Sequence, residues 1–118
     1  MKREDDLLNI EITNRFFEAV DLLIAHKVIS GLRYFAELHG INRANLVTTK
    51  TNPQTKLLRV SYVSYLCDDF KINPSWLLSG KGDLFVKGYT FEKVKKLHPN
   101  RKYNTEKSQK YENQAVKR

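Results

Sequence analysis

The chain has 118 residues, of which 21 are Lys or Arg and 13 are Asp or Glu, so its formal net charge at pH 7 is +8. This length corresponds to one domain, and it excludes a (β/α)₈ barrel and a two-domain nucleotide enzyme, which need far more residues. One cysteine, Cys67, excludes an internal disulfide and points to a reduced, cytoplasmic setting. No apolar run reaches the length of about 18 residues that a membrane span requires.

The N-terminal part is predicted to be a polar leader, residues 1–12, followed by an amphipathic helix. Thr13 and Asn14 are candidate N-cap residues, because their side-chain oxygens can accept hydrogen bonds from the free N–H groups of a first helical turn. Apolar residues then recur at helical spacing for about four turns. We expect this helix to end near residues 29–31.

Two short helices with a glycine between them are predicted next. The first covers Leu32–His39 and ends at Gly40, since glycine adopts a left-handed conformation without strain. The second covers residues 43–51, with Asn42 as its N-cap. Pro53 prevents it from continuing.

After a polar, basic loop, the chain predicts two more helices and an apolar segment. The fourth helix is expected over residues 62–70 with Ser61 as its cap. Asn73-Pro74 is a typical start, a capping residue followed by proline at the first helical position, for a fifth helix over residues 75–79. Residues 84–86 are expected to pack back on the core.

The C-terminal residues 89–118 form a basic tail in which a further helix is predicted over residues 89–97. Beyond Pro99 we expect little fixed structure. The formal charge is −2 for residues 1–31, +4 for 32–88 and +6 for the tail. This distribution favours a polyanion as partner, nucleic acid before an acidic membrane surface. Solubility alone is the competing explanation.

The spacing Ala36–Gly40–Ile41–Leu46 is typical of a helix-turn-helix. This motif needs a small residue where its helices cross, a glycine at the turn and apolar residues that hold the pair together. An ordinary helical hairpin would satisfy the same spacing. The pattern therefore keeps both structures open.

Residues 72–85, Ile-Asn-Pro-Ser-Trp-Leu-Leu-Ser-Gly-Lys-Gly-Asp-Leu-Phe, add a second motif to these helices. Together they resemble the lambda-repressor-like (XRE, Cro/C1-type) helix-turn-helix family, and in particular its phage-repressor-like members. The resemblance covers about residues 13–86. It implies an all-α, compact five-helix domain, here placed at residues 13–88, that binds double-stranded DNA as a homodimer at inverted half-sites.

Three positions differ from that family's pattern. Leu32 stands where glutamine often begins the second helix, and polar Thr49 occupies the late apolar position of the third. Residues 50–53, Lys-Thr-Asn-Pro, replace the usual acidic-glycine ending.

If residues 42–51 form a recognition helix, its N-terminal turns face base edges in the major groove while Leu46 faces inward. Arg43 is suited to a bidentate contact with guanine, and Val47 and the Thr48 methyl group to thymine methyl groups. The predicted base contacts are Asn42, Arg43, Ala44, Val47 and Thr48; the predicted phosphate contacts are Arg33, Lys50, Thr51, Asn52, Gln54 and Lys56. Between residues 33 and 59 there are five basic groups and one acidic group.

No constellation of residues predicts catalysis, a cofactor or a metal site. His26, His39 and His98 are scattered, and the adjacent acids Asp68 and Asp69 point different ways on a helix, so solvation is their expected role. We therefore expect a non-enzymatic transcriptional regulator, a repressor of phage or prophage type, in the cytoplasm of a bacterium or an infected host cell. The alternative is a structural or interaction protein, such as a virion component or an antitoxin-like module, with a DNA or protein partner for residues 89–118.

Overall fold

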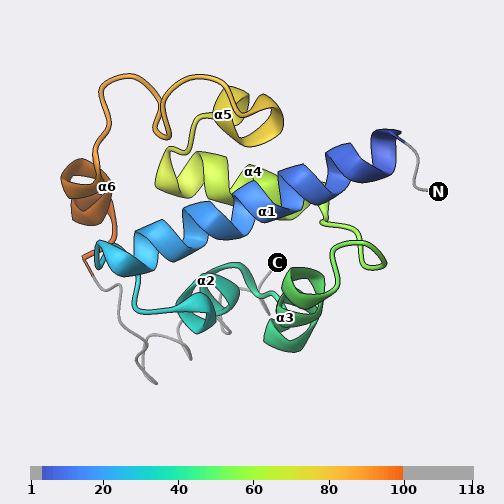
Figure 1. Ribbon diagram of the computed structural model, residues 1–118. Coiled ribbons are helices and arrows are strands. Elements are labelled where there is room, and N and C mark those ends of the chain that lie inside the picture. Colours follow the sequence, from blue (N-terminus) through green and yellow to red (C-terminus); the bar gives the residue numbers. More distant parts are fainter. Residues whose placement is uncertain (1–3, 100–118) are drawn as a thin grey trace.

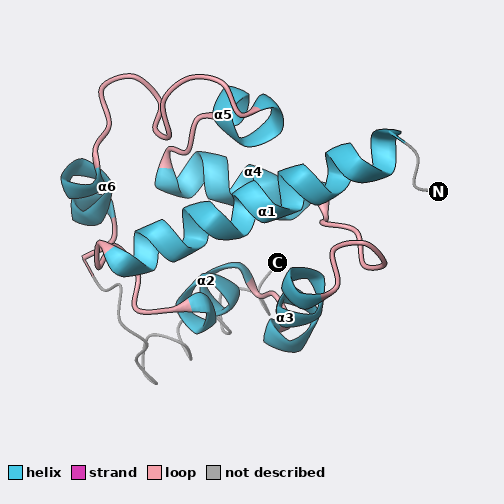
Figure 2. Ribbon diagram, viewed as in Figure 1, coloured by secondary structure: helices cyan, strands magenta, loops and turns pink. Residues whose placement is uncertain are grey.

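The structure is a computed structural model that describes residues 4–99. Within that range it is all-helical, apart from one isolated β-bridge (Figure 2), which confirms the predicted all-α class. None of the described helices is both long enough and apolar enough to cross a membrane. The helices are α1 (Glu4–Ala25), α2 (Leu32–His39), α3 (Arg43–Thr51), α4 (Val60–Phe70), α5 (Pro74–Ser79) and α6 (Phe91–Leu97).

Helix α1 runs through the middle of the molecule and organises the other helices around it (Figure 1). Helices α2 and α3 lie on one side of α1, and α5 lies on the other, with α4 behind. Helix α1 packs against α5 and α3, and α2 packs against α3. Helix α6 lies near the C-terminal end of α1.

The first helix begins earlier than the sequence predicts. Residues 4–12, which were expected to be a leader, form the first turns of α1. Thr13 is buried inside the helix, and its hydroxyl donates to the Asn9 carbonyl oxygen at 2.8 Å, so it does not cap a helix start. A threonine hydroxyl that bonds to the carbonyl four residues earlier is compatible with a helix interior. Both Thr13 and Asn14 lie inside α1, so the prediction that they cap its start was wrong.

The same helix also ends earlier, at Ala25 rather than at residues 29–31. Lys27 adopts a left-handed conformation with φ 62°, and the Val28 N–H donates to the Leu23 carbonyl oxygen at 2.8 Å. This is the hydrogen bond of a Schellman ending, here with lysine at the position that usually holds glycine. Val28 and Ile29 then enter the core from the connecting turn.

Helix α4 likewise starts before its predicted cap. Ser61 lies inside the helix, and the N-cap residue is Arg59, which makes no side-chain capping bond. Helix α5 begins as predicted, because the Asn73 side chain accepts from the Ser75 N–H at 3.1 Å and Pro74 occupies the first position.

The core is formed by the inward faces of these helices and contains three fully buried phenylalanines. The Phe35 ring lies 5.8 Å from the Phe16 ring and 5.9 Å from the Phe70 ring, centroid to centroid. Phe17 is also buried, whereas Trp76 is only partly buried against the cluster. The four phenylalanines thus form the interior of the domain, and Trp76 lies at its edge.

The segment after α5 packs back as expected. Ile72 and Phe85 form an antiparallel bridge, in which the Asn73 N–H donates to the Leu84 carbonyl oxygen and the Val86 N–H to that of Lys71, both at 2.8 Å. These bonds return the chain to the end of α4.

Packed residues continue beyond residue 88, the predicted domain limit. In α6 the Val94 side chain is fully buried, and Phe91 stacks on His26 with ring centroids 3.7 Å apart. The helix predicted over residues 89–97 is therefore present at Phe91–Leu97. Residues 100–118 of the basic tail lie outside the described part of the chain.

Candidate nucleic-acid interface

The turn between α2 and α3 has the geometry of a Schellman motif. Gly40 has φ 65° and ψ 31°, the Ile41 N–H donates to the Ala36 carbonyl oxygen at 2.8 Å, and the Gly40 N–H donates to that of Glu37 at 3.4 Å. Both bonds satisfy carbonyls that the end of α2 would otherwise leave unpaired. The turn therefore fixes the direction in which α3 leaves α2.

Helix α3 is capped as the sequence predicts. The Asn42 side-chain oxygen accepts from the Asn45 N–H at 3.2 Å, which fixes the first turn. Because that oxygen is engaged in the cap, only the amide NH₂ group of Asn42 remains for any ligand.

The inward face of α3 anchors it to the domain. Leu46 is fully buried, as predicted, and Thr49 is 1% exposed. The Thr49 hydroxyl donates to the Asn45 carbonyl oxygen at 3.0 Å, so a polar residue fills the late apolar position without an unsatisfied group. The departure from the family pattern at Thr49 is thus accommodated within the helix itself.

The outward face of α3 carries the other predicted base-contact residues. Arg43, Ala44, Val47 and Thr48 are all exposed. The Thr48 hydroxyl donates to the Ala44 carbonyl oxygen at 2.9 Å, so its methyl group is the part without a hydrogen-bonding role. This face therefore presents one cation, one hydrogen-bonding amide and three small apolar groups to solvent.

The predicted phosphate contacts lie on α2, at the end of α3 and in the loop that follows. Arg33, Lys50, Thr51, Asn52 and Gln54 are exposed, and Lys56 is half-buried. The Thr51 hydroxyl donates to the Val47 carbonyl oxygen at 3.0 Å and accepts from the Asn52 amide at 3.1 Å. Thr51 and Asn52 are thus engaged with each other, whereas Gln54 makes no side-chain hydrogen bond among the described residues.

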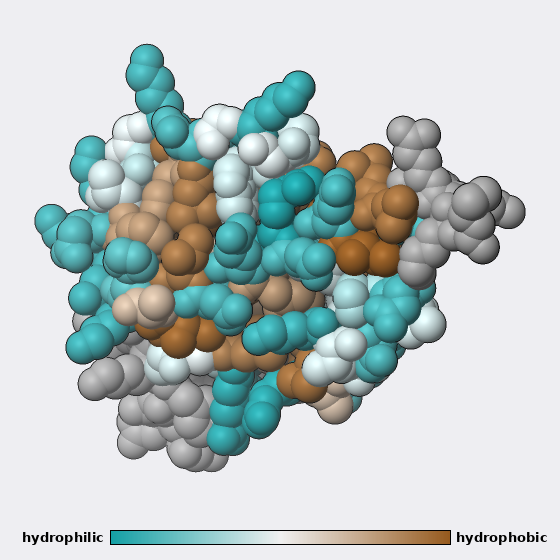
Figure 3. Space-filling model, viewed as in Figure 1, coloured by the Kyte–Doolittle hydropathy of each residue, from teal (hydrophilic) through white to brown (hydrophobic). Residues whose placement is uncertain are grey.

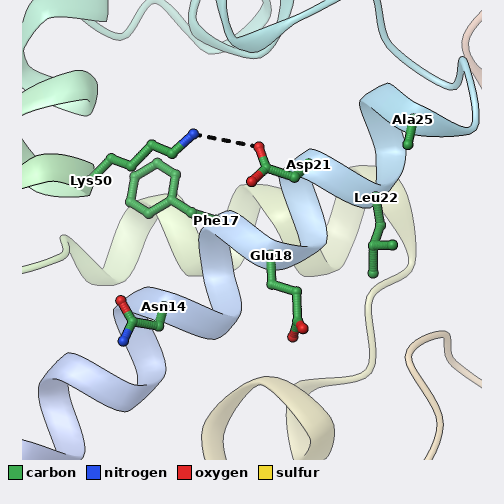
Figure 4. Close-up of a pocket in the computed structure, with 7 residues that line it drawn as sticks. All are labelled: Asn14, Phe17, Glu18, Asp21, Leu22, Ala25 and Lys50. Atoms are coloured by element: carbon green, nitrogen blue, oxygen red, sulfur yellow. Dashed lines mark ion pairs between the residues drawn. The ribbon is translucent and has the colours of Figure 1, made fainter.

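Lys50 is held by a residue that sequence reasoning missed. Its ammonium lies 3.5 Å from an Asp21 carboxylate oxygen on α1 (Figure 4). The sequence contains no signal for this pair, because the partners lie 29 positions apart and only the packing of α3 on α1 brings them together.

Two histidines, His39 and His98, both contact Asp69, which the sequence did not indicate. His39 Nδ1 donates to the Phe35 carbonyl oxygen at 3.0 Å, and its Nε2 is hydrogen-bonded to the Asp69 carboxylate. His98 Nε2 donates to the Asp69 backbone oxygen at 2.7 Å. Asp69 therefore joins α2 and the end of α6 to α4, and the expectation that it is merely solvated was wrong. Both His39 ring nitrogens are thus engaged with groups of the protein itself.

Cys67 is half-buried on α4. Burial raises the pKa of its thiol, and the neighbouring Asp68 carboxylate raises it further. Both effects disfavour the thiolate, which is the nucleophilic form of cysteine.

Comparison with protein-family models, curated proteins and solved structures finds no match to this chain.

Proposed function

We propose that the chain binds double-stranded DNA in a sequence-specific way and regulates transcription, with α3 in the major groove. The observation that carries this proposal is the two-sided character of α3: Leu46 and Thr49 fix one face to the core, while Arg43, Val47 and Thr48 remain exposed on the other. A recognition helix needs this combination of a fixed position and free side chains.

The charge around α3 supports the same function. The overall charge of +8 favours association with a polyanion, and basic residues outnumber acidic ones five to one between residues 33 and 59. Exposed side chains on α2 and in the loop after α3 would contact phosphates and fix the register of the protein on the duplex. We further propose that it acts as a dimeric repressor of the lambda-repressor-like kind.

Fluorescence anisotropy tests the proposal with duplexes selected from a random pool and with unselected duplexes. Arg43→Ala should weaken binding to the selected duplex by about fivefold or more, and relax the preference at one base pair, through loss of a contact of about 1–3 kcal/mol. Lys50→Ala should weaken binding to all duplexes alike and reduce the slope of log K against log salt by about 1.

Lys81→Ala is the matched control, because Lys81 is exposed and lies just after α5, a helix that lies on the side of α1 away from α3 (Figure 1). It should change binding much less than Lys50→Ala does. If the parent chain bound all duplexes equally, or bound none, the proposal of sequence-specific regulation would be refuted.

A second candidate is a protein-interaction or structural module, as in a virion component or an antitoxin-like protein. It is favoured by large apolar side chains that are exposed: Leu7 on α1 is 50% exposed, Leu57 is 63% exposed, and Val60 at the start of α4 is 84% exposed. Figure 3 shows apolar surface over the N-terminal half of α1. Exposed apolar surface that gathers in a patch is typical of sites of protein association.

A further inference from the structure

Lys50 is drawn away from the outward face of α3 by contacts with α1. Besides the ion pair with Asp21, its ammonium lies 5.9 Å from the centroid of the Phe17 ring. Phe17 and Asp21 are one helical turn apart on α1, so they lie on the same side of that helix. Two α1 residues thus contact one cation of the proposed interface.

The three residues that make these contacts line a hollow of about 510 Å³ between α1 and α3. It is lined by Asn14, Phe17, Glu18, Asp21, Leu22, Ala25 and Lys50 (Figure 4). The Asp21 carboxylate points toward Lys50, whereas the Glu18 carboxylate points away from it. Asp21 is therefore the acidic residue of the hollow that forms an ion pair with Lys50 of the proposed interface.

The pair is open to solvent, since the Lys50 and Asp21 side chains are 45% and 58% exposed. Exposed ion pairs are weak and are screened by salt, so a phosphate group can replace the carboxylate. The replacement would leave Asp21 unpaired beside a polyanion, and like charges repel.

We propose that Asp21 is a positioning residue that restrains Lys50 in the free protein and competes with DNA phosphate for its ammonium. This inference rests on the proposed function of α3. Because phosphate contacts carry little sequence information, Asp21 lowers the affinity for all duplexes alike and leaves the order of preference among them unchanged.

The test measures dissociation constants for selected and random duplexes with Asp21→Asn, Lys50→Met and the double variant. Methionine keeps an unbranched side chain next to Phe17 while removing the charge. Asp21→Asn should tighten binding about threefold to fivefold in the parent chain, the effect expected from losing a competing exposed ion pair. In the Lys50→Met background the same change should have less than about half that effect.

Glu18→Gln is the matched control, because it removes the same charge from the same hollow and Glu18 makes no ion pair among the described residues. It should tighten binding much less than Asp21→Asn. Equal tightening by Asp21→Asn with and without Lys50 would show general repulsion and overturn the inference, as would no tightening at all. If no variant binds any duplex, the proposed function fails as well, and the two failures are thus distinguishable.

Discussion

The Arg15 side chain on α1 donates a hydrogen bond to the backbone carbonyl of Leu77 at the C-terminal end of α5. Its Nε donates to the Leu77 carbonyl oxygen at 2.7 Å, and a terminal nitrogen donates to that of Leu78 at 3.0 Å. A cation at this end satisfies free carbonyls and also interacts favourably with the helix dipole. A helix of only six residues is thereby attached to the central helix of the domain.

Replacing Arg15 with methionine should lower the free energy of unfolding by about 2 kcal/mol, because hydrogen bonds to charged groups contribute about 1.5–3 kcal/mol and this one is partly exposed. Urea denaturation followed by circular dichroism measures the change. Arg59→Met, at an exposed arginine without a side-chain capping bond, is the control and should stay within about 0.5 kcal/mol of the parent. Equal effects of the two substitutions would contradict the role assigned to Arg15.

Gly40→Ala should destabilise the domain by about 1–2 kcal/mol through backbone strain alone. The left-handed φ of 65° disfavours any side chain, although a Cβ atom there would meet nothing within 4 Å. Gly31 is the matched position, because it has an extended φ of 169° and equally open space. Gly31→Ala should be neutral or stabilising by about 0.4–1 kcal/mol. Thermal unfolding of both variants measures the difference. A lower melting temperature for Gly40→Ala alone would show that the left-handed backbone conformation, and not a steric clash of the Cβ atom, requires glycine in this turn.

Asp69→Ala should destabilise the domain, because it removes the carboxylate partner of His39, whose side chain is 7% exposed, and leaves its ring nitrogen unpaired. A double-mutant cycle with His39→Gln should give a coupling energy of about 1 kcal/mol. Asp68→Ala controls for charge, since Asp68 is exposed and accepts only a long bond, 3.4 Å, from the Ser64 hydroxyl. A coupling energy near zero for Asp69 and His39 would show that the pair contributes nothing to stability.

Cys67 should react slowly with iodoacetamide at pH 8, with a rate that rises at a higher pH than for a free cysteine. Its raised pKa keeps the thiol protonated where an ordinary cysteine is partly ionised. Because burial is the larger cause, Asp68→Asn should shift the pH profile down only slightly. Folded protein that reacts as fast as urea-unfolded protein would disprove the protection.

The parts of the fold that the sequence predicted well are those set by local signals. Gly40, Asn42 and Asn73-Pro74 act within a few residues along the chain, and the structure has the expected turn and caps at each. Thr13 and Ser61 are capping residues by type, yet both lie inside helices. Residue type alone cannot distinguish a capping residue from one inside a helix, where a hydroxyl such as that of Thr13 can bond back to a carbonyl of the same helix.

The candidate site was predictable in part for the same reason. The exposed and buried faces of α3 follow from helical periodicity, which places Leu46 inward and Val47 outward. The pairing of Lys50 with Asp21 and of His39 with Asp69 depends on how separate helices pack, and no short-range pattern encodes it.

The position of α6 has a practical consequence for anyone who trims this protein. A fragment ending at residue 88 would lack Val94, which is fully buried. It would also lack His98, whose ring stacks on the Phe70 ring with centroids 4.4 Å apart. The core surface that α6 covers would then be exposed to solvent, and exposed apolar surface promotes aggregation. Recombinant work on the domain should retain the sequence through Pro99.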